Sequence, residues 1–256
     1  MSAGAAPRIF VERRLAGGER IELAEAASRH VQVLRLQPGA ALVLFDGHGG
    51  EWPSVVVRMG RSAVDVVVGE RIDIDRELPC HVTLAIGMPA NERMDALVEK
   101  ATELGVAALQ PLVCERSVLR LSGERAERRL THWRAVAVAA SEQCGRTRLP
   151  CIEPVRSLRD WLEGLAPPPP DEQRFVLSPQ AHGVWKSASA GTVALVFLSG
   201  PEGGLGPAEE QAALASGFGA VSLGARILRA DTAPLAVLAA CAMAQAKPLS
   251  AGLAVA

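Results

Sequence analysis

A glycine-rich segment, Leu198-Ser-Gly-Pro-Glu-Gly-Gly204, follows an apolar run and precedes a helix that we expect to start near Pro207. Ligands of α/β proteins bind at the carboxyl ends of strands, where loops meet the N-termini of helices. Glycine has no Cβ, so its backbone can approach a ligand closely, and Pro201 fixes one φ angle. The segment therefore predicts a ligand loop, with a plain glycine turn as the equally compatible alternative.

The familiar nucleotide-binding motifs do not match this loop. It has no Gly-Lys-Ser/Thr, as a P-loop requires. Counted from Gly204-Leu-Gly206, the sixth position is Glu209, so the dinucleotide fingerprint fails as well.

A second segment whose residues could bind a ligand is Leu223-Gly-Ala-Arg-Ile-Leu-Arg-Ala-Asp-Thr232, which also follows a predicted strand. Ile227 and Leu228 can offer apolar walls and backbone amides to an adenine ring, with the guanidinium of Arg229 nearby. Taken alone the pattern is weak, because basic and apolar residues mix at most helix starts.

The elements that position these loops change character near Leu78-Pro79. Before it, short apolar runs with turn clusters predict a small β barrel with one short helix at 23–34. After it, predicted strands alternate with predicted helices, which indicates a mainly parallel α/β sheet. The last helix, 233–246, is apolar on most faces and is therefore expected to be buried. The predicted barrel strands are 8–11, 41–45, 52–57 and 63–68, and the main predicted helices of the second part are 92–104, 124–143 and 233–246.

The formal net charge of −1 does not indicate a polyanionic partner, but the charged residues are unevenly distributed along the chain. The segment from Arg116 to Arg148 contains eight arginines and three glutamates. Such a stripe can neutralise phosphates. An arginine bias that reflects a GC-rich genome is an equally compatible explanation, because the chain has only three lysines.

The five cysteines contain no Cys-x-x-Cys pair, so the sequence suggests neither a disulfide framework nor a metal site. No apolar run approaches the length of a membrane span, and the basic residues near the N-terminus stand in the order opposite to a secretory signal. We therefore expect a cytoplasmic protein with no membrane association.

Together the two loops resemble the cofactor loops of the SPOUT methyltransferases. Met94-Asp-Ala-Leu-Val-Glu-Lys-Ala-Thr-Glu-Leu-Gly-Val106 and Ser141-Glu-Gln-Cys-Gly-Arg146 are similar to signature segments of one SPOUT family, the 16S rRNA uridine-N3 methyltransferases (RsmE). Arg8-Ile-Phe-Val11 and His30-Val-Gln-Val-Leu-Arg35 match it too. The resemblance runs from about Arg8 to the C-terminus.

The resemblance implies a PUA-like RNA-binding barrel over residues 1–76, followed by an α/β SPOUT domain over 77–256 that is tied in a trefoil knot and dimerises. It implies S-adenosylmethionine as cofactor and 16S rRNA, within the small ribosomal subunit, as substrate. The cofactor-binding residues it implies are Leu177, Ser178, Gly200, Pro201, Glu202, Gly203, Gly204, Leu223, Gly224, Ile227 and Leu228.

Uracil N3 is a poor nucleophile while it keeps its proton, so catalysis needs a base or a group that stabilises the uracil anion. Arg229 is the candidate cation, and Glu202 or Asp231 the candidate base. Each carboxylate has an alternative use in capping a helix or pairing with Arg229. Asp231 departs from the family, which usually has Glu there.

Four further residues are candidates for RNA contact: Arg8, His30, Arg35 and Arg146. Two other functions stay open, a SPOUT enzyme that methylates ribose 2′-OH or guanine N1, and an RNA-binding module without enzymatic activity.

Overall fold

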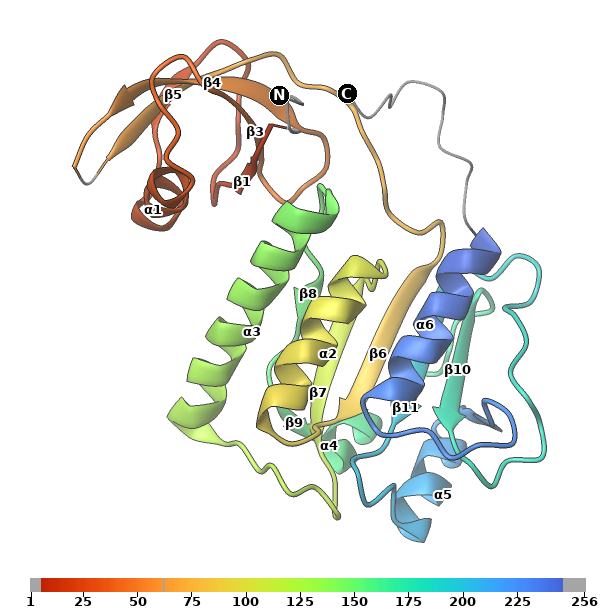
Figure 1. Cartoon of the computed structure of the whole chain (residues 1–256). Helices are drawn as coiled ribbons and strands as arrows, with labels where there is room; N and C mark the ends of the chain where they lie inside the picture. Colours follow the sequence, from red (N-terminus) through yellow and green to blue (C-terminus); the bar gives the residue numbers. More distant parts are fainter. Residues whose placement is uncertain (1–5, 62, 246–256) are drawn as a thin grey trace. The chain divides into compact units, whose positions relative to one another are not determined.

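The structure is a computed structural model, and it describes residues 6–61 and 63–245. The chain forms two compact units (Figure 1). The first holds the described residues up to Glu77 together with Ser141–Leu149, and the second holds Leu78–Ala140 together with 150–245. The end of the predicted second domain, 246–256, lies outside the described residues.

The first unit is built on a five-stranded sheet in the order β1-β3-β4-β5-β2. From Trp52 to Val57 every second residue of β4 is buried, because one face of the sheet covers a core and the other faces solvent. Ile9 and Ile21 belong to the two edge strands yet share that core, so the sheet curves around it in the manner expected of a barrel. The elements are β1 (Arg8–Phe10), β2 (Arg20–Glu22), α1 (Glu25–Val33), β3 (Ala41–Phe45), β4 (Trp52–Met59) and β5 (Val64–Val68).

The second unit holds a seven-stranded sheet in which every strand pairing is parallel, as the alternation of predicted strands and helices indicates. Its order is β12-β10-β11-β6-β7-β8, with β9 also paired to β7. The strands are β6 (His81–Gly87), β7 (Ala108–Val113), β8 (Cys151–Ile152), β9 (Arg156–Ser157), β10 (Glu172–Leu177), β11 (Ala194–Ser199) and β12 (Gly219–Val221).

Helices cover both faces of this sheet and make three layers. Leu84 and Ile86 of β6 point into one core, and Ala85 points into the other, since successive side chains of a strand alternate. The first face is covered by α2 (Asn91–Glu103), α3 (Gly123–Cys144) and α6 (Thr232–Gln245), which lie in front of the sheet in Figure 1. The second face is covered by α4 (Leu158–Glu163) and α5 (Pro207–Ala215).

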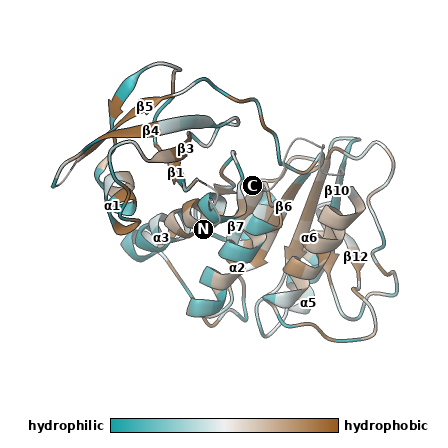
Figure 2. Cartoon of the chain, turned by 45° about the horizontal axis from the view of Figure 1, so that its top comes forward, coloured by the Kyte–Doolittle hydropathy of each residue, from teal (hydrophilic) through white to brown (hydrophobic). Residues whose placement is uncertain are grey.

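Burial of the last helix on most faces was the expectation, and for α6 it is wrong. Val237, Leu238 and Cys241 are buried against the sheet, but Ala236 and Met243 are exposed, Met243 by 79%. The reason is that α6 packs against the sheet on one side and has no further layer of the described chain above it. In Figure 2 the helix is coloured white to brown, whereas α2 and α3 carry teal, hydrophilic stretches.

The strand order reverses where the loops of interest leave the sheet. β11 follows β10 in the chain but lies between β10 and β6, and β12 returns to the far side of β10. The carboxyl ends of β10, β11 and β12 are therefore neighbours. A reversal of this kind is the usual place for a ligand in an open α/β sheet.

Candidate active site

A cavity of about 470 Å³ opens at the carboxyl ends of these three strands. It is lined by three segments, 176–180 at the end of β10, 199–205 at the end of β11 and 221–230 at the end of β12, together with Arg93 and Arg116. All eleven residues predicted for the cofactor line it. The structure thus brings together segments that stand up to about fifty residues apart, and their role in binding stays a prediction.

The glycine loop is a tight turn in which two positions disfavour a side chain, for different reasons. A Cβ added to Gly200 would lie 2.8 Å from the backbone nitrogen of Leu205. Gly204 has a φ of +70°, a conformation that favours glycine, and its N–H donates to the carbonyl of Pro201 at 2.8 Å. Pro201 in turn packs so closely on Gly87 that a Cβ at Gly87 would meet it at 2.6 Å.

Side chains from neighbouring elements fix this loop from outside. Arg116 donates from Nη1 to the carbonyls of Gly203, at 3.1 Å, and Leu205, at 3.4 Å. Glu209, in the first turn of α5, accepts from the N–H of Gly206 at 2.8 Å through Oε2 and from the N–H of Glu115 at 2.8 Å through Oε1. These contacts hold the shape of the glycine loop.

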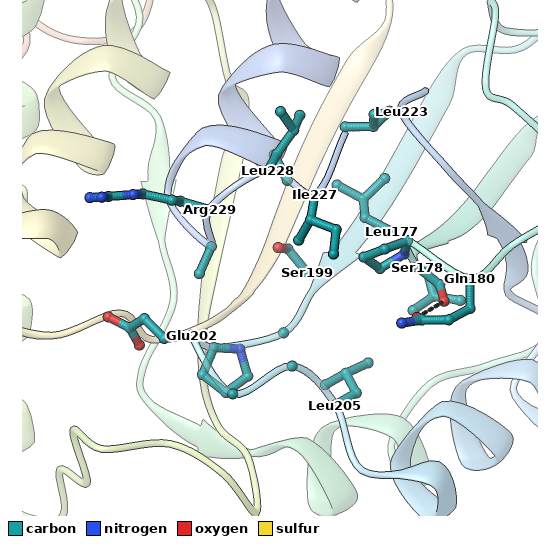
Figure 3. A pocket seen from close by; sticks show the side chains of 18 of the residues that line it. Leu177, Ser178, Gln180, Ser199, Glu202, Leu205, Leu223, Ile227, Leu228 and Arg229 are labelled. Carbon is teal, nitrogen blue, oxygen red and sulfur yellow. Dashed lines mark hydrogen bonds between the residues drawn. The ribbon is translucent and has the colours of Figure 1, made fainter. Parts of the chain in front are cut away.

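The cavity has an apolar side and a charged side (Figure 3). Leu177, Leu223, Ile227 and Leu228 surround one part, and Ile227 is 82% exposed. Glu202 and Arg229 lie on the other side in Figure 3. An exposed isoleucine at an open cavity suits a flat apolar ring, and the charged side suits a polar reacting group.

The carboxylate of Glu202 is already used by the protein. Its Oε1 accepts a hydrogen bond from the N–H of Ala90 at 3.0 Å and lies 3.4 Å from Nη1 of Arg93. Ala90 is the N-cap residue of α2, and its own side chain makes no capping hydrogen bond. The carboxylate of Glu202 therefore caps the start of the helix. This contact favours the helix-capping alternative for Glu202.

Arg229 is exposed and lines the cavity, and no carboxylate among the described residues lies within ion-pair distance of it. Asp231 is not among the lining residues, and its Oδ1 is buried without a hydrogen-bond partner in the described part of the chain. The alternative in which Arg229 pairs with either carboxylate is thus not formed in this structure.

Two of the predicted RNA contacts are occupied inside the first unit. Arg8 pairs with Glu51, which also lies 3.2 Å from Arg76. Burial acts to raise the pKa of Glu51, but hydrogen bonds and charge from both arginines outweigh it, so the pKa lies below its ordinary value. Arg146 pairs with Glu77, and only 5% of its side chain is exposed. Burial and pairing favour a structural role for Arg8 and Arg146.

The other two stay predictions. His30 is half-exposed, with Nδ1 3.1 Å from Oε2 of Glu142. Arg35 is largely exposed at the end of α1, with a φ of 55°.

Sequence patterns gave no sign that Arg93, from α2, and Arg116, from the segment after β7, line the cavity. Arg93 and Glu202 stand 109 positions apart, so nothing local could have joined them. In the described part of the chain, no cluster of three or more His, Cys, Asp or Glu side chains is placed to hold a metal ion. None of its helices is long and apolar enough to cross a membrane.

Comparison with known families gives two matches. The family model of the RNA methyltransferase domain matches residues 76–242, and that of the RNA methyltransferase PUA domain matches residues 23–69. The ribosomal RNA small subunit methyltransferase E of Synechocystis is 35% identical over 222 residues, which is 86% of this chain and 71% of the relative. That of Mycobacterium tuberculosis is 33% identical and covers 81% of this chain and 80% of its own.

Solved structures match over nearly the whole length. The ribosomal RNA small subunit methyltransferase E of Neisseria gonorrhoeae, bound to S-adenosylmethionine, superposes with a TM-score of 0.86 at 35% identity, and covers 92% of this chain and 96% of its own. A methyltransferase of Legionella pneumophila in complex with the same cofactor also has a TM-score of 0.86, at 28% identity, over 93% of this chain and 98% of its own.

Proposed function

Because the chain belongs to the ribosomal RNA small subunit methyltransferase E family, we propose that it transfers a methyl group from S-adenosylmethionine to N3 of one uridine in 16S ribosomal RNA. S-adenosylmethionine-dependent methylation of small-subunit ribosomal RNA is the coarser activity, and N3 of uridine is the finer assignment. The observation that carries the proposal is the single cavity shared by the three loops.

The residues present fit the cofactor. Gly200 and Gly204 let backbone N–H and carbonyl groups reach a ligand, and the side chains of Leu177, Leu223 and Ile227 suit an adenine ring. When bound, S-adenosylmethionine supplies an electrophilic methyl group on a positively charged sulfur. The protein's part is to hold a nucleophile in line with that group and to stabilise the charge that develops.

We assign the stabilising role to Arg229. Loss of the N3 proton leaves a negative charge on the uracil ring, and an exposed, always-charged guanidinium at the cavity favours that anion. The N3 proton passes to water. Glu202 is a positioning residue in this scheme, since its Oε1 holds the start of α2 and so sets the glycine loop against β6. The target base has to leave its stack to enter the cavity.

We assign RNA docking to the predicted first domain, residues 1–76, and cofactor binding and chemistry to the predicted second domain, residues 77–256. Ser141–Leu149 groups with the first unit and is included in the docking part. We propose that the enzyme acts in the cytoplasm, where small ribosomal subunits are made. From the family resemblance we also propose that the second domain contains a trefoil knot.

Nucleoside mass spectrometry of ribosomal RNA tests the proposed chemistry. A strain that lacks this protein is expected to lose 3-methyluridine from 16S rRNA and to regain it when the gene is restored. Loss of a 2′-O-methylated nucleoside or of 1-methylguanosine instead would move the enzyme to one of the sibling reactions. An unchanged nucleoside profile would leave only the RNA-binding function.

A homodimer is also proposed, and the uncovered face of α6 supports it. Ala236, Ala240 and Met243 are exposed along a helix that carries no charged residue. Exposed apolar patches of this kind mark interfaces. Light scattering at micromolar concentration is expected to give twice the monomer mass of 26.9 kDa, and Met243→Lys to shift it toward the monomer. A wild-type mass of one chain would refute the dimer.

A further inference from the structure

Three arginines gather at the start of α3, outside the cavity already described. Arg128 and Arg129 stand three and four residues after Arg125, which places both beside it on the helix surface. With Leu119 and Leu121 they line a hollow of about 290 Å³. We call this site the arginine hollow.

Stability alone does not account for the arginine hollow. Like charges at such spacings destabilise a helix, and cations in the first turns oppose the helix dipole. Arg129 lies 3.8 Å from Asp95, but no described carboxylate comes within ion-pair distance of Arg125 or Arg128. Glu124 and Glu127 belong to the same turns of α3 and form no ion pair with either. Arrangements that break a local rule without compensation concentrate at functional sites.

The arginine hollow lies next to the methyl-transfer cavity. The segment between β7 and α3 contributes Arg116 to the cavity and Leu119 to the hollow. Leu119 stands three positions after Arg116, so their backbones are at most about 11 Å apart. Helix α2 makes the same connection: Arg93 lines the cavity, and Asp95 faces Arg129. The first turns of α2 and α3 lie at the lower edge of the sheet in Figure 1, the edge from which the cavity loops leave.

We propose that the arginine hollow binds backbone phosphates of the RNA strand beside the target nucleotide. The inference rests on the proposed function, because it takes RNA as the substrate. Guanidinium groups bind phosphate oxygens through paired N–H donors, and two unpaired ones on adjacent turns suit a polyanion. Leu119 and Leu121 give the floor of the hollow an apolar surface for the sugar or base between phosphates.

The test is a double variant, Arg125→Ala with Arg128→Ala, compared with the wild type in binding a 16S rRNA fragment. RNA affinity is expected to fall at least about tenfold at low salt, and the slope of log K against log salt to become less negative by roughly 1.4, or 0.7 for each lost contact with single-stranded RNA. Cofactor affinity and the single-turnover rate at saturating RNA are expected to stay at wild-type values, with the effect confined to KM for RNA.

A matched control removes the same charge elsewhere. Arg159→Ala with Lys186→Ala also takes away two exposed cations of the second unit, and Arg159 lies on α4, on the opposite face of the sheet. This control is expected to change RNA affinity and the salt slope little. Thermal unfolding is a second control: removing mutually repelling arginines is expected to leave the Tm unchanged or raised, whereas a structural role predicts a lower Tm.

Three outcomes would overturn the arginine hollow as an RNA site: an unchanged salt slope in the double variant, an equal loss in the control, or a lowered Tm that accounts for the weaker binding. These results are distinct from failure of the proposed function, in which the wild type itself would not methylate the rRNA fragment.

Discussion

Arg229→Ala is expected to lower the single-turnover rate of methyl transfer by about a hundredfold or more, the scale observed when one oriented electrostatic donor is removed. The side chain lines the cavity next to Leu228, and no described carboxylate neutralises it. Cofactor affinity is expected to change much less, because the loops offer backbone groups for that purpose. Arg229→Lys is expected to restore little activity, since an ammonium lacks the planar pair of donors.

Single-turnover rates at saturating cofactor separate chemistry from binding. If Arg229 only shapes its loop, Arg229→Ala would lower stability and cofactor affinity together and leave the methyl-transfer rate intact. That outcome would remove Arg229 from the chemistry.

Two variants of Glu202, measured in the same experiment, test whether its carboxylate is a positioning group or the base. Glu202→Gln keeps an oxygen that accepts the N–H of Ala90, so a positioning residue should tolerate it, whereas Glu202→Ala leaves that N–H without its acceptor. We expect a rate near wild type for Gln and a reduced rate for Ala. A loss in Glu202→Gln as deep as in Arg229→Ala would make Glu202 the base.

Local patterns were sufficient to predict the architecture around the site. Apolar runs of strand length alternating with amphipathic helices predicted a parallel sheet, and the structure confirms it. The glycine loop and the segment at Leu223 were found because each follows such a run. Both signals arise within about ten consecutive residues, so no knowledge of distant contacts was needed.

The contacts that the sequence did not predict are the long-range ones. Glu202 reaches Ala90, and Arg116 reaches Gly203, through chain reversals that no periodicity encodes. Arg146 was expected to meet RNA because its segment is part of the family match, and such a match looks the same whether the arginine is exposed or buried. Its pairing with Glu77 depends on Ser141–Leu149 joining the first unit. Likewise, the apolar composition of α6 could not tell a fully buried helix from one with an uncovered face.

Gly200→Ala is expected to weaken cofactor binding at least tenfold through the addition of a single methyl group. The new Cβ would lie 2.8 Å from the nitrogen of Leu205 and 2.9 Å from the carbonyl carbon of Gly204. Both are backbone atoms of the loop, so the turn itself must move and its ligand-facing groups with it. At Gly203, by contrast, an added Cβ would meet the side chain of Arg116 at 3.0 Å, which makes Gly200 the sharper test.

Calorimetric titration with S-adenosylmethionine is the measurement, and Gly183→Ala is the matched control. A Cβ at Gly183 would have the carbonyl oxygen of Ala220 as its nearest neighbour, at 3.9 Å, an ordinary contact, and Gly183 does not line the cavity. We expect wild-type affinity for the control and a loss of at least tenfold, about 1.4 kcal/mol, for Gly200→Ala. Circular dichroism should show both variants folded, because the change is confined to one loop at the edge of the sheet. Wild-type affinity in a folded Gly200→Ala variant would show that cofactor binding does not depend on this turn. The cavity would then not be the cofactor site of the proposed reaction.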